Sequence, residues 1–285
     1  MSKSKVGVGI ITCNRVDYLK TLLNSLIPCE DQIDELVVVN DGDPANSLGL
    51  SHKHSAWLDN LANIGVGKSK NKAMKHLLER GCDYIFIIED DMVILDPTVF
   101  NKYIEAHKKS GIHHFNYGPG SPFNRKQTIQ NFDLHNRHLL NQHSEPNPKL
   151  IVEYSRDVKI ALYEHTVAMF SFFTREVLEE VGLIDEEFYN AWEHVDHTYR
   201  IIKAGMHPPF WWFADIYDSH KCLTEAPGAI DNSSIANKSE QWEKNVYGGR
   251  EIYKHKHGHY PNQPPVSTKE EVIIKIKQLK NDTSS

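Results

Sequence analysis

Residues 84–91 read YIFIIEDD, an apolar run with β-branched and aromatic side chains that ends in three carboxylates. A continuous apolar run of this length is typical of a buried strand. Two similar runs precede it, VGVGIIT at 6–12 and LVVV at 36–39, and each also ends in polar or small residues. Ligands in open α/β sheets bind outside the carboxyl ends of the strands. We therefore expect one sheet edge to gather the polar side chains that carry the function.

Helical patterns separate these strands. Leucine recurs at helical spacing within residues 17–26, and a second helix is expected from about Ser69 to Arg80, ended by Gly81. This alternation predicts an α/β fold with a mostly parallel central sheet flanked by helices, Rossmann-like in its layers, with a C-terminal extension. The other expected elements are irregular structure with room for a hairpin at 111–148, a strand at 166–173, a helix at 174–181 capped by Thr174, a helix at about 194–204, an aromatic-rich strand at 208–214, a mobile loop at 224–239, a linker at 255–265 and a helix at 270–279.

Composition limits the class of protein. The chain has 285 residues, of which 40% are hydrophobic and 25% charged, which suits one large α/β domain or a domain with a small appendage. A formal net charge of −6 argues against a grip on nucleic acid through phosphate contacts. Nucleic acid is therefore not an expected partner.

The cysteines indicate a compartment. They are dispersed and form no C-x-x-C pair, and the one at position 82 precedes an apolar run, where a buried free thiol is expected. No signal peptide is expected at the start of the chain. A reducing cytoplasm fits these features best. The four cysteines are Cys13, Cys29, Cys82 and Cys222.

The C-terminal helix offers two further options. No apolar stretch approaches the roughly 20 residues that a membrane span needs, so no transmembrane segment is expected. The helix carries Lys275, Lys277 and Lys280, which suit either contact with a membrane surface or self-association into a homo-oligomer. A solvated face is the expectation that we favour.

Residues 63–73, NIGVGKSKNKA, resemble the end of a phosphate-binding P-loop. That motif, G-x-x-x-x-G-K-[ST], needs its first glycine five residues before Gly67, where this chain has Ala62. The motif also follows a buried strand, and the preceding SHKHSAWLDN at 51–60 is too polar to be one. The segment is therefore not expected to be a P-loop.

Three adjacent carboxylates at Glu89, Asp90 and Asp91 repel one another unless something compensates their charge. A divalent cation does so well, since Mg²⁺ and Mn²⁺ prefer carboxylate oxygens and often share substrate phosphates. The alternative is a solvated acidic turn. Placement at the end of a strand favours the functional interpretation.

Four segments in order, GIITCNRVDYLKTLLNSL, VVVNDGD, NIGVGKSKN and YIFIIEDDM, resemble the GT-A-fold nucleotide-sugar glycosyltransferases of the family-2-like type. In that family the first strand ends in T-x-N-R, an acidic turn after the second holds the uridine, and a later N-x-G segment helps to hold the donor. The resemblance implies that NIGVGKSKNKA binds a sugar donor and that Lys70 contacts its diphosphate or sugar, the alternative being a solvated lysine. The donor-binding residues that it implies are Thr12, Asn14, Arg15, Asp41, Asn63, Gly65, Lys70, Glu89 and Asp90.

Residues 172–205 resemble the acceptor-side segment of the same family, which has an E-D pair before a helix ending in K-A-G. An inverting transfer needs a base for the acceptor hydroxyl, and a carboxylate at a helix start suits this task. This chain has Glu193 followed by His194 where the family has Asp, so the base stays open among Glu193, Asp196 and His194. We favour Glu193; a capping carboxylate is the alternative for either acid.

The resemblance also implies a metal site and an acceptor surface. Asp91 and His220, with Glu89 or Asp90, would hold Mn²⁺ or Mg²⁺, although a lone histidine is also often structural. Trp192 and Trp211 are candidates for stacking on the acceptor. Trp211 and Trp212 should lie on opposite faces of a strand, so that one of them is core.

These features predict a metal-dependent hexosyl- or N-acetylhexosaminyltransferase that moves sugar from a UDP-sugar to a glycan or another hydroxyl-bearing acceptor, with inversion. A donor-binding half is expected at 1–110, an acceptor-binding and catalytic half at 111–254, and a linker and helix at 255–285. One alternative is a sugar-nucleotide pyrophosphorylase, which wants a glycine-rich basic loop where residues 13–17 read CNRVD. The other is a non-catalytic module that binds nucleotide or glycan.

Overall fold

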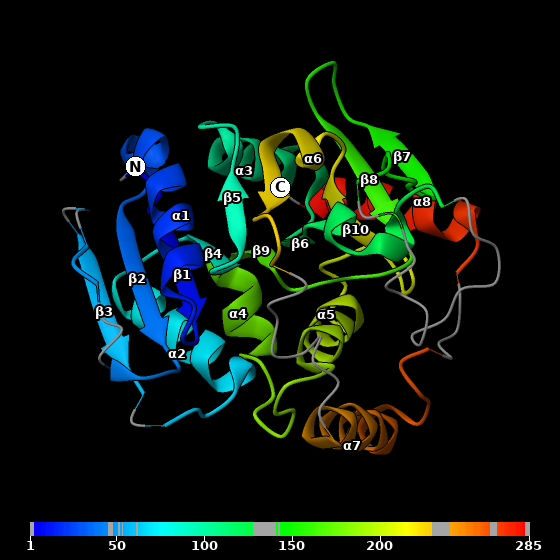
Figure 1. The fold of residues 1–285 in the computed structure, drawn as a ribbon. Helices are drawn as coiled ribbons and strands as arrows, with labels where there is room; N and C mark the ends of the chain where they lie inside the picture. Colours follow the sequence, from blue (N-terminus) through cyan, green and yellow to red (C-terminus); the bar gives the residue numbers. More distant parts are fainter. Residues whose placement is uncertain are drawn as a thin grey trace.

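The computed structural model describes residues 3–44, 48–50, 52, 54–60, 62–127, 141, 143–229, 240–262 and 267–282. At its centre is a six-stranded sheet in which the first four strands of the spatial order are parallel and β9 is antiparallel to both of its neighbours (Figure 1). This confirms the expected α/β fold with a mostly parallel sheet. The spatial order is β3 (Ser55–Asp59), β2 (Glu35–Asn40), β1 (Val6–Thr12), β4 (Tyr84–Glu89), β9 (Phe170–Thr174) and β6 (His114–Asn116).

The three apolar runs of the sequence are adjacent strands of this sheet. Ile11 of β1 pairs with Val39 on one side and with Glu89 on the other, and Thr12 pairs with Asn40. All seven residues of β1 are buried. The three strands therefore end at the same edge, as the sequence predicts.

Helices cover both faces of the sheet. Val8 of β1 packs in one core cluster and Ile11 in another, because successive side chains of a strand point to opposite faces. The first cluster takes side chains from α1 (Val16–Leu26), α3 (Val99–Ser110) and α8 (Lys269–Asp282). The second takes side chains from α2 (Val66–Glu79), α4 (Arg175–Val181) and α5 (Glu193–Lys203). Thr174 caps α4 as expected, since its hydroxyl accepts a hydrogen bond from the Val177 N–H.

Two smaller sheets complete the described fold. A two-stranded sheet pairs β5 (Met92–Ile94), which starts directly after Asp91, with β11 (Leu223–Glu225). The short helix α6 (Ser219–Cys222) leads into β11. The remaining elements are the sheet β10 (Phe213–Ile216), β8 (Lys159–Tyr163) and β7 (Leu150–Glu153), and the 3₁₀ helices η1 (Ile27–Gln32), η3 (Gly118–Gly120) and η4 (Pro122–Asn124).

The helix α7 (Glu240–His257) lies beside α5 (Figure 1). The indole N–H of Trp192, at the start of α5, donates to the Val246 carbonyl oxygen at 3.0 Å. The linker expected at 255–265 thus begins inside the last turn of α7. Within the described part of the chain, no helix combines the length and apolarity that crossing a bilayer requires.

Several sequence expectations differ from the structure. The stretch 51–60, judged too polar for a strand, contains β3, an edge strand of mostly half-buried residues whose Trp57 packs against one core cluster and whose Ala56 and Leu58 pack against the other. The helix expected from Ser69 begins one turn earlier, at Val66, so Lys70 and Asn71 lie in its second turn rather than at its start. The segment expected to be irregular at 111–148 contains β6.

The tryptophan pair was predicted for the wrong reason. Trp211 and Trp212 precede β10 rather than lying on its two faces, although Trp212 is buried and Trp211 is half-buried. The expected hairpin at 111–148 and the expected loop at 224–239 extend over residues outside the described ranges. Thr224 and Glu225 themselves belong to β11.

Candidate active site

The acidic residues after β4 meet the loop after β1. The Thr12 hydroxyl donates to Asp90 Oδ2 at 2.7 Å. The Arg15 guanidinium pairs with both aspartates, reaching Asp90 Oδ1 and, at 3.0 Å, Asp91 Oδ2. One arginine therefore compensates two neighbouring carboxylates, and the structure brings four of the predicted site residues together.

One carboxylate oxygen of Asp91 has no hydrogen-bond partner. Its Oδ1 atom is buried and has no hydrogen-bond partner, whereas its Oδ2 accepts from Arg15. Burial raises the pKa of Asp91, the negative charge of Glu89 adds to this rise, and Arg15 opposes it. A buried carboxylate oxygen without a donor is costly, so a cation beside Oδ1 would remove an unfavourable contribution.

Asp41, expected to hold a uridine, organises the chain before α2. Its Oδ1 accepts from the Asn60 side chain and from the Ile64 N–H, each at 2.8 Å, and its Oδ2 accepts from the Gly65 N–H at 3.1 Å. Gly65 has a φ of +94°, and a Cβ there would lie 2.7 Å from the Tyr189 carbonyl oxygen. Glycine is required at this position by both its backbone and its neighbour.

Asn14 and Asn63 connect the loops after β1, β2 and β3. Asn14 Oδ1 accepts from the Asp43 N–H at 2.8 Å, and the Asn63 amide lies 3.4 Å from Cys13 Sγ. The Tyr189 hydroxyl donates to Asn63 Oδ1 at 3.0 Å. These contacts link the predicted donor segment to the chain just before α5.

Lys70 lies between two carboxylates of different elements. Its Nζ donates to Glu89 Oε1 at 2.8 Å and stands 3.6 Å from Glu193 Oε1. The side chain of Lys70 is only 2% exposed. The end of β4 and the start of α5, the two predicted catalytic regions, are thus joined through one ammonium group.

Glu193 is held in its ionised form. Burial opposes its charge, but the neighbouring His194, 3.3 Å from Oε1, and Lys70 outweigh burial and lower the pKa of Glu193 to about 2. A carboxylate that is ionised at neutral pH can accept a proton. Of the three base candidates, Glu193 shares its partner Lys70 with Glu89 at the end of β4.

Asp196 makes other contacts. It is fully buried, its Oδ2 accepts from Arg200 Nε at 2.9 Å, and its Oδ1 lies 2.7 Å from His257 Nε2 on α7. Both of its oxygens are therefore engaged, Oδ2 within α5 and Oδ1 with α7. Its predicted role as a base stays a prediction.

The two tryptophans differ in surroundings. Trp192 has a φ of +70° at the start of α5 and is bound to α7, as described above. Trp211 stacks on Phe210, with ring centroids 4.7 Å apart, and meets His165 edge-on. Their contact with an acceptor stays a prediction.

The expected metal site is only partly assembled. The Ala226 N–H donates to the Asp91 carbonyl, and Leu223 pairs with Ile94, so β11 runs from α6, which contains His220, towards Asp91. Nδ1 of His220 is buried without a hydrogen-bond partner, and burial lowers the pKa of this histidine. The described residues contain no group of three or more His, Cys, Asp or Glu side chains arranged to hold a metal. A shared ion on Asp91 and His220 stays a prediction.

Several residues of the site carry no clear sequence signal. Tyr189, Asn60 and His257 reach Asn63, Asp41 and Asp196 from distant or irregular segments. A tyrosine four residues before the favoured base is the one feature that could have directed attention to Tyr189.

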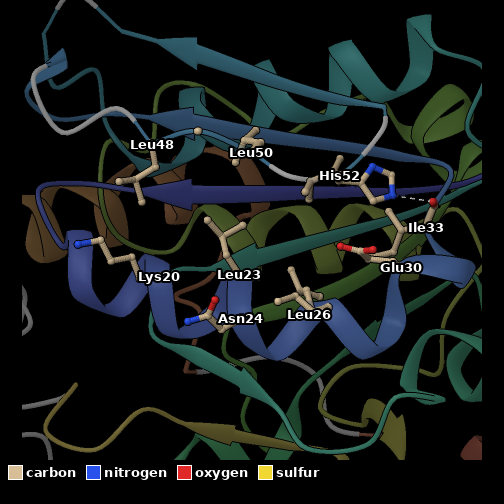
Figure 2. Close-up of a pocket in the computed structure, with 12 residues that line it drawn as sticks. Lys20, Leu23, Asn24, Leu26, Glu30, Ile33, Leu48, Leu50 and His52 are labelled. Atoms are coloured by element: carbon tan, nitrogen blue, oxygen red, sulfur yellow. Dashed lines mark hydrogen bonds between the residues drawn. The ribbon is translucent and has the colours of Figure 1, made fainter.

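A cavity of about 280 Å³ lies away from this edge, between α1, η1, residues 48–50 and residue 52 (Figure 2). It is lined by leucines, with Lys20 and His52 at its margins; these leucines are Leu23, Leu26, Leu48 and Leu50. The His52 Nε2 atom lies 3.0 Å from the Ile33 carbonyl oxygen. None of the predicted site residues lines this cavity.

Comparison with known proteins assigns the chain to a family. The model described as glycosyl transferase family 2 matches residues 7–182, which is more than half of the chain. An uncharacterised glycosyltransferase of Acanthamoeba polyphaga mimivirus is 22% identical over 248 residues, covering 82% of this chain and 86% of the relative.

Solved structures share the fold. S. aureus TarS 1-349 in complex with UDP has a TM-score of 0.51 and 14% identity, over 96% of this chain and 80% of that chain. A mannosyltransferase from Pyrobaculum calidifontis in complex with GDP-Man and Mn²⁺ has a TM-score of 0.45 and 13% identity, over 70% of this chain but only 53% of that chain. The mostly parallel sheet flanked by helices is the GT-A architecture of such enzymes. The chain belongs to glycosyl transferase family 2 and is a GT-A-fold glycosyltransferase.

Proposed function

We propose that the protein transfers a sugar from a UDP-sugar to a hydroxyl group of a glycan or similar acceptor, with inversion at the anomeric carbon. The observation that carries this proposal is the meeting of the Glu89–Asp91 cluster and the ionised, buried Glu193 at the carboxyl ends of β1 and β4. The choice of UDP as the nucleotide of the donor is supported by the complex of S. aureus TarS 1-349 with UDP, because that protein shares the fold.

Glu193 acts as the base in this proposal. It takes the proton of the acceptor hydroxyl while that oxygen attacks the anomeric carbon and forms the new glycosidic bond. The bond between the anomeric carbon and the diphosphate oxygen breaks at the same time, and its electron pair leaves with UDP. Attack from the face opposite the leaving group inverts the anomeric centre. General base catalysis of this kind contributes about 10²–10⁴-fold to a rate.

Mn²⁺ or Mg²⁺ is the proposed cofactor. The residues fit a divalent cation, because Asp91 Oδ1 is a buried carboxylate oxygen without a partner and the negative charge of Glu89 acts on Asp91. Asp91 would hold the ion, with His220 as the further ligand that the sequence predicts. When bound, the ion supplies positive charge to the diphosphate leaving group.

The donor pocket is proposed to lie against the loops that Asp41 organises. Thr12, Arg15 and Asp90 form its wall at the end of β1, and Asn14, Asn63 and Gly65 form the neighbouring wall before α2. Trp192 and Trp211 are proposed to face the acceptor. All four cysteines are free thiols, which supports a reducing compartment such as the cytoplasm.

Hydrolysis of the donor without an acceptor tests the proposal. The protein is incubated with UDP-, GDP-, TDP- and CMP-sugars, with Mn²⁺ or with EDTA, and the released nucleotide is measured. We expect release from a UDP-sugar that needs the metal and is lost in Asp91→Asn. No release from any donor, together with no binding of UDP by calorimetry, would overturn the proposed function.

A further inference from the structure

Lys70 has an environment unlike that of a lysine that waits for a phosphate. It lies on α2, 2% exposed, and its three possible hydrogen-bond donors face three acceptors of the protein itself. Glu89 Oε1 is 2.8 Å from Nζ, the Ala168 carbonyl oxygen is 3.3 Å away, and Glu193 Oε1 is 3.6 Å away. A phosphate oxygen would have to displace one of them.

Charge explains why these contacts persist. A buried ammonium group is costly unless it is paired, and a buried carboxylate is equally costly. The side chain of Glu193 is 5% exposed, and that of Glu89 is 24% exposed. Lys70 therefore pairs at the same time with a carboxylate of β4 and with a carboxylate of α5.

The packing of α2 against the chain before α5 also helps to position Glu193. Gly67, one turn before Lys70 on α2, leaves room for the chain before α5, since a Cβ there would lie 3.3 Å from the Phe188 carbonyl oxygen and 3.7 Å from Glu193 Cβ. The His194 ring lies 3.3 Å from the same Glu193 oxygen that faces Lys70. Two neighbouring side chains therefore hold this oxygen of the base.

We propose that Lys70 is a positioning residue, which fixes the base Glu193 relative to Glu89 at the donor edge, and that it does not itself bind the diphosphate of the donor. This inference rests on the proposed function. It differs from the role that the resemblance implies for Lys70, and the two roles predict different kinetics. A positioning residue affects turnover, whereas a phosphate contact affects the binding of nucleotide.

The test compares Lys70→Met and Lys70→Arg with Lys75→Met, a control on the exposed side of α2, where Lys75 is 60% exposed. Calorimetry with UDP and Mn²⁺ gives the Kd, and hydrolysis of the UDP-sugar that the unmodified protein cleaves gives kcat and KM. Circular dichroism checks that each variant is folded.

For Lys70→Met we expect kcat to fall by about 10²-fold, since a small displacement of a catalytic group costs about that much. The Kd of UDP should stay within about threefold. Lys70→Arg should recover part of the lost kcat because it restores the positive charge, and Lys75→Met should behave like the unmodified protein.

A rise of about tenfold or more in the Kd of UDP for either variant, with kcat little changed, would overturn the inference and establish a phosphate contact. If Lys70→Met does not fold, Lys70→Arg decides by the same comparison of kcat with Kd, because its planar fork alters the geometry and keeps the charge. If the unmodified protein neither binds UDP nor hydrolyses a donor, the proposed function fails, and this inference fails with it.

Discussion

At the scale of single residues, the site depends on side chains that serve other parts of the chain. Asp41 accepts from the Asn60 side chain and from two backbone N–H groups, while Arg15 bridges Asp90 and Asp91. Lys70 joins Glu89 to Glu193. In each case one charged group fixes two segments that are far apart in sequence. Removing such a group leaves its buried hydrogen-bond and ion-pair partners without a partner of their own.

Asp41→Ala should therefore destabilise the fold. It leaves one N–H of the Asn60 amide and the Ile64 N–H without an acceptor, while the Gly65 N–H keeps Asn63 Oδ1, and each buried unpaired donor costs about 1–3 kcal/mol. We expect the free energy of unfolding, measured with urea, to fall by at least about 2 kcal/mol. Asp17→Ala, whose side chain is 99% exposed, is the control and should change it by less than about 0.5 kcal/mol. Equal stability of the two variants would refute the anchoring role of Asp41.

The residue types of the site were predictable, but their partners were not. T-x-N-R after β1, the N-x-G segment and the acidic triple are local patterns that indicate the family from sequence alone. The contact of Lys70 with Glu193 joins residues in two separate helices, and no local pattern encodes it. Asp41 was expected to hold a nucleotide because its type and place are visible, whereas its bonds to Ile64 and Gly65 depend on how the chain returns to the sheet.

At the scale of elements, α7 supports the start of α5. Trp192 donates to α7, and His257 of α7 binds Asp196 one turn inside α5. Lys256 pairs with Asp185 and, at 3.3 Å, with Glu187. The matched family segment ends at residue 182, so this support comes from a part of the chain beyond it. Positioning of Glu193 should therefore respond to changes in α7.

Two adjacent glycines of α7 provide a matched test. A Cβ at Gly249 would lie 2.9 Å from the Ala191 carbonyl oxygen and 2.9 Å from Trp192 Cδ1, whereas a Cβ at Gly248 would meet nothing within 4 Å. Alanine in a helix interior is favoured over glycine by about 1 kcal/mol. Gly248→Ala should raise the free energy of unfolding by up to this amount and keep turnover.

Gly249→Ala should instead reduce both quantities, because α7 must move away from the chain just before Glu193. A lower kcat for donor hydrolysis with an unchanged Kd for UDP is the expected result. If Gly249→Ala matches Gly248→Ala in stability and turnover, α7 does not position the base.

The elements themselves were predictable where their patterns were strong. β1, β2 and β4 were found because both of their faces are buried, which gives uninterrupted apolar runs. β3 was missed because it is an edge strand of half-buried residues. α7 has a weak apolar pattern, with two glycines in its middle and only Gly249 and Tyr253 buried. Its place is set by contacts with α5 that a local pattern does not show.

At the scale of the whole molecule, burial of neutral histidines makes stability depend on pH. Burial lowers the pKa of His107 and of His207 to about 4 and that of His197 to about 3. It also lowers the pKa of His114 well below its ordinary value. In the unfolded chain these groups titrate near about 6.5. Between these values the unfolded state binds more protons than the folded state, so stability falls as the pH decreases.

Each such histidine should lower the free energy of unfolding between pH 7 and pH 5 by up to about 1.4 kcal/mol per pH unit, whereas Asp90 and Asp215, whose pKa burial raises to about 7, act in the opposite direction. Urea denaturation at both pH values measures this change. His197→Gln, whose amide can still donate to the Gly182 carbonyl, should show a smaller fall than the unmodified protein. His255→Gln, at an exposed position, should show the same fall. A pH dependence of His197→Gln that is equal to that of the unmodified protein would contradict this role of the buried histidines.

We propose Glu193 as the base of a sugar transfer that takes place at the carboxyl edge of the sheet. The kinetics of Glu193→Gln test this role, because glutamine keeps the shape of the side chain and removes its charge. We expect kcat for cleavage of the UDP-sugar to fall by about 10²–10⁴-fold while the Kd of UDP with Mn²⁺ stays nearly unchanged. A variant that retains turnover within a few-fold of the unmodified protein would show that another group accepts the proton.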